Sequence, residues 1–346
     1  MKRKVFILAL TVLFIFPFLT PSSAAQRVLA NVDTYIVTGI AASGNTIFFG
    51  DTEGNLTAVN TDTQTEIWKF KDGDSTPTGT PAIVDGNVIF AKVTGEIFCL
   101  KISDGSLVWR YIPPSGGSVN EGLNDGVAAG GGKVYAAFTT GELKAFDLKN
   151  GHVLWTYKSD QGLRTAPAYA NGLVLLGGYN GLFSMIDAKT GKRVNGGGAG
   201  GAINTPVVSG GNVYYSAWDG SVHAVQIKDV IPLWDAKADE PITTPPVISG
   251  GMLVVGTASG KICALSEKDG SLLWQYDTEG GQVIVRPVVS NGMVLVGTGD
   301  NRLLALNAAS GKLSNEQPDR YALNTDPAFG GNRLYLVSGQ QIFSME

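Results

Sequence analysis

The sequence predicts an all-β fold, an eight-bladed β-propeller of four-stranded antiparallel blades. Three observations predict it: a repeat of about forty residues, apolar positions on both faces of the strands in each repeat, and a recurrent tryptophan near the end of most repeats. A single such sheet cannot stand alone, whereas blades stacked around an axis bury both faces. Eight units account for residues 26–346, which we expect to form one domain.

Each repeat is aligned on an anchor, the residue before a short apolar strand. The anchors are Gly54, Gly95, Gly141, Gly181, Gly220, Gly260, Asn301 and Gln340. Every unit has an apolar side chain two and five positions after the anchor, so we expect both faces of this strand to be buried. The position four after the anchor is mostly Ala, which indicates that something packs closely there.

The remaining strands are placed by proline and tryptophan. Prolines stand fourteen residues before five anchors and thirteen before the last, and a β-rich run such as 87–91 or 133–138 follows them. Tryptophan stands fourteen residues after the anchor in five units. These tryptophans are Trp68, Trp109, Trp155, Trp234 and Trp274. Turn sequences of the DG, NG and TG kind separate four short strands in each unit.

The ring must also close. The last unit ends soon after its third strand, and residues 27–37 precede the first unit without belonging to it. We expect this N-terminal segment to supply the outer strand of the eighth blade, which would protect an exposed strand edge.

Composition excludes several classes of protein. With 44% hydrophobic residues and a net charge of −4, the chain is not predicted to be disordered. Its pI of about 5.3 argues against nucleic-acid binding, and two cysteines do not make a disulfide scaffold.

Residues 1–25 have the pattern of a secretory signal peptide. A basic start at residues 2–4 precedes the apolar run 5–16, and Ser23-Ala24-Ala25 offers a small-residue cleavage site. The run is shorter than the ~20 residues that span a bilayer, although a retained single anchor remains the alternative. We expect a periplasmic or secreted protein that begins at Gln26 and has no transmembrane segment after cleavage.

Several units resemble the pyrroloquinoline-quinone (PQQ)-type propeller repeat. The stretch Ala145-Phe146-Asp147 through Gly151 to Trp155 matches its pattern, whereas Gln64 and Val230 replace the usual glycine in two units. The resemblance covers about residues 27–346 and implies that the five tryptophans dock each blade on its neighbour. It implies fold and not function, because this repeat occurs both in quinone-dependent dehydrogenases and in BamB, the scaffold family of outer-membrane protein assembly.

The BamB family is the closer resemblance in length, blade number and one loop. Leu163-Arg164 followed by Ala166-Pro167 is similar to the family's Leu-Arg loop, which contacts a barrel-forming partner. The resemblance therefore implies Leu163 and Arg164 as partner-binding residues, with an exposed leucine beside a forked cation as a hot spot. The alternative is that Arg164 only caps the loop. The family's acidic pair is absent from residues 201–206, and Asp239 and Glu240 lie one blade later.

The dehydrogenase branch is the runner-up. Such enzymes carry adjacent cysteines over the cofactor and an acidic calcium cluster, whereas Cys99 and Cys263 fall in blades two and six. These cysteines are expected to be free and buried, because a disulfide needs Cα atoms within ~7 Å. We predict no cofactor, no metal site and no catalytic residues; His152 and His223 make neither a triad nor a zinc site.

A small polar ligand is the third reading. Residues just before the innermost strands approach the central funnel, where they form a candidate ligand site or pair with one another or with water. These are Asn124, Asp125, Arg286 and Asp326. The glycine-rich stretch 196–201 fits G-x-G-x-x-G, but no predicted helix follows it, as a dinucleotide site requires.

The sequence thus favours an exported, monomeric, non-catalytic scaffold that binds an envelope protein. A PQQ-dependent oxidoreductase and a small-ligand recognition or sensory propeller are the alternatives.

Overall fold

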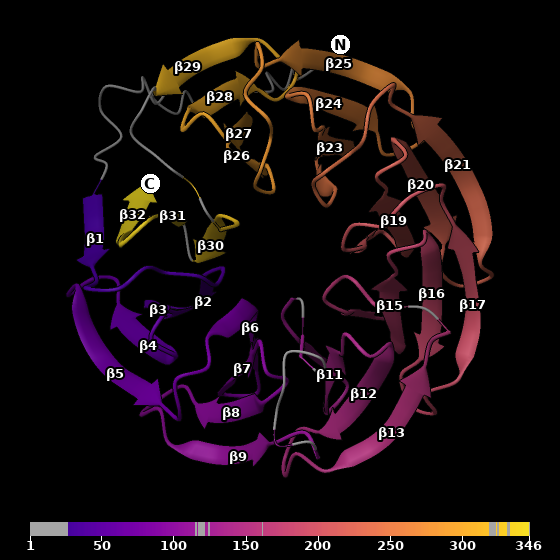
Figure 1. The fold of residues 1–346 in the computed structure, drawn as a ribbon. Helices are drawn as coiled ribbons and strands as arrows, with labels where there is room; N and C mark the ends of the chain where they lie inside the picture. The colour runs from indigo at the N-terminus through magenta and orange to yellow at the C-terminus, as the bar shows by residue number, and fades with distance from the viewer. Residues whose placement is uncertain are drawn as a thin grey trace, which may run out of the picture.

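The computed structural model describes residues 27–114, 116, 122–123, 125–160, 162–317, 323, 325–330 and 333–345. These residues form thirty-two strands in eight antiparallel sheets of four, arranged as blades around a central opening (Figure 1). None of them lies in a helix long and apolar enough to cross a membrane. The predicted eight-bladed propeller is confirmed, while the predicted signal peptide, residues 1–25, lies outside the described residues.

Seven blades take four consecutive strands each, numbered from the ring axis to the rim (Figure 1). Blade one has β2 (Ala41–Ser43), β3 (Thr46–Gly50), β4 (Asn55–Asn60) and β5 (Thr65–Lys71). Blade two has β6 (Pro77–Val84), β7 (Asn87–Lys92), β8 (Ile97–Lys101) and β9 (Leu107–Tyr111). Blade three has β10 (Ala128–Gly130), β11 (Lys133–Ala137), β12 (Glu142–Asp147) and β13 (Val153–Lys158). Blade four has β14 (Ala168–Ala170), β15 (Leu173–Gly177), β16 (Leu182–Asp187) and β17 (Arg193–Gly198).

The next three blades follow the same plan. Blade five has β18 (Val207–Ser209), β19 (Asn212–Ser216), β20 (Ser221–Gln226) and β21 (Ile231–Lys237). Blade six has β22 (Val247–Ser249), β23 (Met252–Gly256), β24 (Lys261–Ser266) and β25 (Leu272–Asp277). Blade seven has β26 (Val288–Ser290), β27 (Met293–Gly297), β28 (Leu303–Asn307) and β29 (Leu313–Gln317).

Blade eight draws on both ends of the described chain. It has β30 (Ala328–Gly330), β31 (Arg333–Ser338), β32 (Gln341–Met345) and, at the outer edge, β1 (Arg27–Asn31). Strand β1 pairs antiparallel with β32, with Val28 opposite Phe343. Leu29 is buried in an apolar cluster with Ile36 of the segment that leads into blade one and Tyr335 of blade eight.

The small residue four positions after the anchor is explained by the tryptophan that it faces. Ala58 lies directly across from Trp68, and the same pairing joins Ala145 to Trp155. In blade four, where Asn195 replaces the tryptophan, the facing residue is the larger Met185. A β-bulge follows each of these pairs. The bulge and the small residue together leave room for the indole ring.

Each of the five tryptophans reaches the next blade. The indole N–H donates to a backbone carbonyl 33–39 residues further along the chain, at 2.7–3.2 Å. The acceptors, in blade order, are the carbonyl oxygens of Ile102, Leu148, Ala188, Glu267 and Ala308. Burial of a large ring with its polar edge satisfied makes this an anchoring contact between blades.

The hydrophobic core is divided among the interfaces between blades. The described residues form eight apolar clusters, and each cluster takes its members from two adjacent blades. The cluster between blades two and three, for example, joins Ile89 and Cys99 to Val134 and Phe146. Because each blade buries both faces against its neighbours, the stability of one blade depends on the whole ring.

Candidate partner-binding surface and axial cavity

A polar cavity of about 440 Å³ opens on the axis of the ring. It lies on the axis because its walls come from blades three, four, five, six and eight, and blades four and eight stand opposite each other in a ring of eight. Its lining residues are Asp125, Arg164, Thr165, Tyr179, Asn204, Thr205, Thr243, Pro245 and Asp326. Three of the residues predicted for a partner or ligand, Asp125, Arg164 and Asp326, therefore meet at one cavity.

Arg164 spans the boundary between blades four and five. Its Nη1 donates to the backbone oxygen of Ile203 and to Asn204 Oδ1, both at 3.1 Å. Its guanidinium carbon lies 4.9 Å from the ring centroid of Trp218, in a cation–π contact. Burial lowers the pKa of Arg164, with Tyr179 and Asp125 acting in the opposite direction. The side chain is a cation at neutral pH that is held in one place by the neighbouring blade.

Leu163 does not form the exposed half of a hot spot. It is only 5% exposed and belongs to the apolar cluster between blades three and four. It forms an isolated antiparallel β-bridge with Gly178, and within the described part of the chain seven blades have such a β-bridge at the same point. The bridging residues are Ile36, Leu123, Leu163, Ile203, Ile242, Val283 and Leu323. All seven are buried. The expectation that Leu163 is exposed was therefore wrong, because leucine fills a structural position of the repeat.

Two exposed aromatic residues flank Arg164 instead. Tyr179 is 54% exposed at the rim of the cavity, and Trp218 is 48% exposed on the next blade. Both stand two residues before the anchor glycine, a position held by Thr52, Val93 and Ala258 in blades one, two and six. That unusual pair of aromatics was the sequence signal for this surface, and it was missed. We call Arg164, Tyr179 and Trp218 the Arg164 surface.

The carboxylates predicted to line the funnel accept hydrogen bonds from backbone N–H groups. Asp125 accepts from the N–H of Gly126 at 2.7 Å and of Ala166, in the next blade, at 3.2 Å. Asp326 accepts from the N–H of Arg286 at 2.8 Å, and the Arg286 guanidinium lies 3.6 Å from the same carboxylate. These carboxylates join neighbouring blades at the axis. Asn124 lies outside the described residues.

The sequence of the chain matches a known protein family. The family model described as "Outer membrane protein assembly factor BamB" matches residues 23–229 and 195–345, and so nearly all of the chain. The chain belongs to this BamB family of PQQ-like repeat propellers.

Solved structures agree with this family in fold. BamB from Moraxella catarrhalis superposes with a TM-score of 0.78 at 18% identity, covering 91% of this chain and 98% of that one. The computationally designed protein Ika8 gives a TM-score of 0.76 at 16% identity, covering 92% and 99%. At these identities the likeness shows the propeller fold alone.

Two curated relatives match over shorter stretches. A quinohemoprotein alcohol dehydrogenase ADH-IIG of Pseudomonas putida is 28% identical over 144 residues, 36% of this chain. A tetrathionate hydrolase of Acidithiobacillus ferrooxidans is 30% identical over 86 residues, 25% of this chain. The matched parts cover only 20% and 17% of the two relatives, so the chain spans a small part of their length.

In this BamB-family propeller a serine, a histidine and an aspartate do come together, in blade five. His223 Nε2 lies 2.8 Å from Ser221 Oγ, and His223 Nδ1 lies 2.6 Å from Asp235 Oδ1. The sequence did not reveal this set of hydrogen-bonded side chains, because Asp235 is brought next to His223 only by the pairing of β20 with β21. Ser221 is buried, its Oγ lies 2.6 Å from Asp219 Oδ1, and neither it nor His223 lines the axial cavity. The arrangement ties β20 to β21 and offers a substrate no access to the serine.

The glycine-rich stretch 196–201 has a packing role in the BamB-family fold. Its first three residues lie in β17, and no helix follows among the described residues. A Cβ on Gly197 would stand 2.9 Å from the hydroxyl of Tyr215, whose ring enters the space between blades four and five. The described residues also contain no cluster of three His, Cys, Asp or Glu that could hold a metal ion.

Proposed function

We propose that the protein is a non-catalytic scaffold of the bacterial cell envelope, exported by residues 1–25, which binds a protein partner through the Arg164 surface. Membership of the BamB family and the propeller fold support the scaffold role. The single observation that carries the binding site is the immobilised Arg164, which lines the axial cavity together with half-exposed Tyr179 and lies against the half-exposed ring of Trp218.

The chemistry of this surface suits protein recognition. Arginine, tyrosine and tryptophan are the residues that most often dominate binding energy at protein interfaces. Here Asn204, Ile203 and Trp218 already restrict the Arg164 side chain, so little conformational entropy is lost when a partner binds. The guanidinium favours a partner carboxylate or carbonyl, and the rings favour an apolar neighbour beside it.

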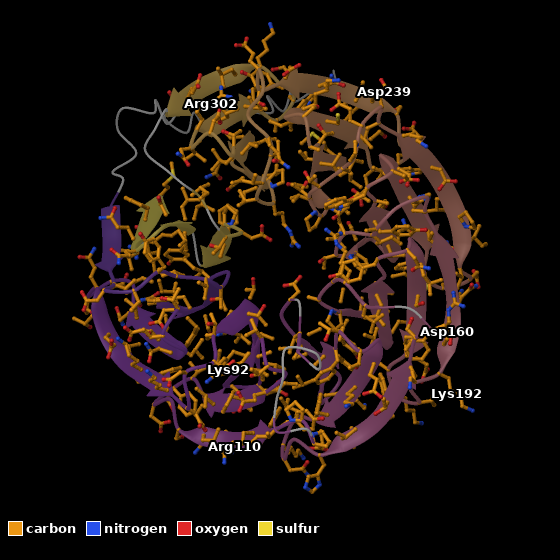
Figure 2. All side chains as sticks on the ribbon, viewed as in Figure 1. Lys92, Arg110, Asp160, Lys192, Asp239 and Arg302 are labelled. Atoms are coloured by element: carbon orange, nitrogen blue, oxygen red, sulfur yellow. The ribbon has the colours of Figure 1, made fainter. Side chains whose placement is uncertain are left out.

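Affinity capture from an envelope extract tests this function. We expect Arg164→Glu to lose the partners that the unmodified protein captures, and Trp218→Ala and Tyr179→Ala to weaken capture by ~2 kcal/mol or more each. Lys192→Glu, at the outer rim of the same blade, is the matched control and should capture normally (Figure 2). Equal melting temperatures would exclude unfolding. If Arg164→Glu and Trp218→Ala both capture the same partners as the unmodified protein, the surface has no such role.

A quinone-dependent oxidoreductase is the second candidate, favoured by the partial match to an alcohol dehydrogenase. The residues of the axial cavity do not fit such a cofactor well, because Asp125 and Asp326 already bind backbone N–H groups of adjacent blades. Cys99 and Cys263, in blades two and six, do not line this cavity. Dye reduction with added PQQ and calcium separates the candidates, since sustained turnover would overturn the scaffold proposal.

A further inference from the structure

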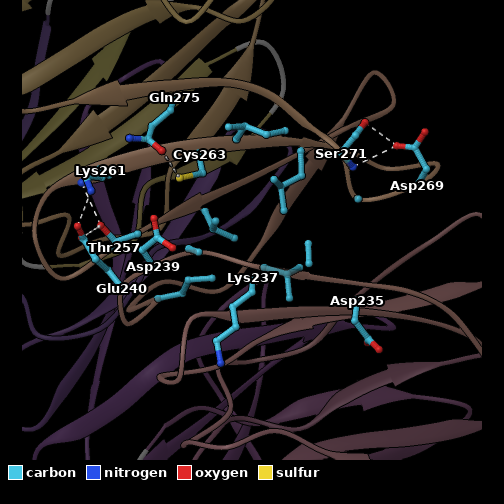
Figure 3. A pocket seen from close by; sticks show the side chains of 18 residues that line it. Asp235, Lys237, Asp239, Glu240, Thr257, Lys261, Cys263, Asp269, Ser271 and Gln275 are labelled. Carbon is cyan, nitrogen blue, oxygen red and sulfur yellow. Dashed lines mark hydrogen bonds and ion pairs between the residues drawn. The ribbon is translucent and has the colours of Figure 1, made fainter.

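A second cavity, far from the axis, lies between blades five and six (Figure 3). Its volume is about 390 Å³, and its apolar floor includes Ala236 of β21, Val255 of β23, and Cys263 and Leu265 of β24. An apolar cavity of ~150 Å³ is enough to admit benzene. We call this cavity the blade 5–6 groove; none of its lining residues belongs to the Arg164 surface.

The groove exists because one aromatic ring of the repeat is missing. The residue two positions after the tryptophan is Phe70, Tyr111, Tyr157 and Tyr276 in blades one, two, three and six, but Ala236 in blade five. Phe70 fills its interface by lying 6.1 Å from Phe90 and 5.6 Å from Phe98, ring centroid to ring centroid.

Blade six does not compensate for the loss. Blade four also lacks the ring, at Gly197, but there Tyr215 and the stacked His223 of the following blade fill the space, with ring centroids 4.7 Å apart. The corresponding cross-strand pair of blade six is Val255 and Cys263, which is smaller. Neither blade therefore supplies a ring at this point of the interface, although Trp234 of blade five reaches blade six elsewhere in it.

The rim of the groove is acidic. Three carboxylates, Asp239, Glu240 and Asp269, and two ammonium groups, Lys237 and Lys261, line the groove, which leaves one negative charge in excess. Asp235 also lines it, but its carboxylate is bound to His223. Glu240 and Lys261 pair with each other at 2.5 Å (Figure 3). Asp239 and Asp269 are both exposed.

We propose that the blade 5–6 groove is a second docking site, which takes an aromatic side chain of a partner peptide that carries a basic residue next to it. The aromatic ring occupies the space that Phe70, Tyr111, Tyr157 and Tyr276 fill at other interfaces. The basic neighbour is attracted by the excess of carboxylates at the rim.

Titration of the purified chain with short peptides tests the proposal. The probe is acetyl-Gly-Lys-Phe-Lys-Gly-amide, measured by calorimetry at low salt. We expect saturable binding that becomes at least tenfold weaker when alanine replaces the phenylalanine or glutamate replaces both lysines. The variant Ala236→Phe places the repeat's own ring in the groove. It should keep or raise the melting temperature and weaken binding of the probe at least tenfold.

Charge variants and a distant control complete the test. Asp239→Asn with Asp269→Asn should weaken binding several-fold at low salt, whereas Asp160→Asn, in the exposed segment that follows β13, should not (Figure 2). Arg164→Glu should bind the probe normally, so failure of the scaffold proposal leaves this site standing. Unchanged affinity in folded Ala236→Phe, equal binding of the alanine peptide, or no binding by the unmodified chain up to ~2 mM peptide would overturn the proposal.

Discussion

Gly105 lies against the indole ring of Trp68 in the preceding blade. A Cβ atom on Gly105 would stand 2.7 Å from Trp68 Cδ2, and the φ angle of Gly105 is +69°. The four other tryptophans make the same contact. The pairs are Trp109 with Gly151, Trp155 with Gly191, Trp234 with Gly270, and Trp274 with Gly311. Tryptophan and glycine therefore form the two sides of one contact between blades, although they stand 36–42 residues apart in the sequence.

Substitution of Gly105 should lower the unfolding free energy by more than its positive φ angle alone explains. We expect Gly105→Ala to be destabilised relative to Gly86→Ala by ~1–3 kcal/mol, because only Gly105 has a ring in the way. Gly86 has a similar φ of +74°, and a Cβ there meets nothing within 4 Å. Denaturant unfolding of both variants gives the comparison. Equal losses would mean that the indole yields to the methyl group without cost.

Truncation of the partner ring provides the reciprocal test. Trp68→Ala should lose ~3–5 kcal/mol of unfolding free energy, the usual loss for a buried large ring. In the Trp68→Ala background, Gly105→Ala should cost no more than Gly86→Ala. If the two glycine variants still differ there, the contact with Trp68 is not the cause.

The same contact explains two places where the sequence departs from the repeat. Gln64 and Val230 stand where glycine is usual, with φ angles of +60° and +53°. The blade before Val230 has Asn195 in place of tryptophan, and the edge strand before Gln64 is β1 (27–31), which contains no tryptophan. Glycine is lost where no indole lies against it. The aligned sequence contained this correlation, but its meaning required the knowledge that one residue touches the next blade.

Periodicity predicted the fold well because each blade repeats the same packing problem. It predicted the site less well, since a motif resemblance does not separate a structural position from a functional one. Leu163 looked like half of a binding motif, yet its position is apolar and buried in seven blades. Tyr179 and Trp218 are aromatic at a repeat position that holds smaller residues in blades one, two and six, and this difference indicates a functional surface. Ser221 and Asp235 join His223 only through side-chain geometry and strand pairing, which the repeat does not display.

Removal of the N-terminal strand should destabilise the whole ring. Residues 27–31 form the outer edge of blade eight, and Leu29 and Ile36 are buried between blades eight and one. Deletion of residues 27–36 should lower the melting temperature by many degrees, because it exposes an edge strand and part of a core cluster. Differential scanning calorimetry measures the change. An unchanged melting temperature would show that β1 adds nothing to the ring.

The two cysteine thiols should be unreactive in the native protein. Both are free and buried, and burial raises the pKa of Cys99 to about 12 and that of Cys263 to about 11. Because the thiolate is the reactive form, neither should react with a disulfide reagent at pH 8. We expect two reactive thiols in the denatured protein and none in the native protein. Rapid native reaction of Cys263 alone would show that the blade 5–6 groove opens further than the structure shows.

Because of Lys92, the unfolding free energy should depend on pH in the alkaline range. The residue is fully buried in blade two, its Nζ donates to the carbonyl oxygen of Asp72, and its ammonium lies 5.2 Å from the centroid of Phe98 (Figure 2). Burial lowers the pKa of Lys92 below its usual 10.5, with Glu96, Asp72 and Asp74 opposing the shift. Between the folded and unfolded pKa values the unfolded chain holds the extra proton.

The contribution of Lys92 to the unfolding free energy should therefore rise as pH increases through the folded pKa toward 10.5. Other groups titrate in the same range, so the measured quantity is the difference between the unmodified protein and Lys92→Met, followed by urea unfolding from pH 7 to 10.5. That difference should shift in favour of the unmodified protein as pH rises. A difference that stays constant, or shifts toward Lys92→Met, would show that Lys92 is not held with a lowered pKa.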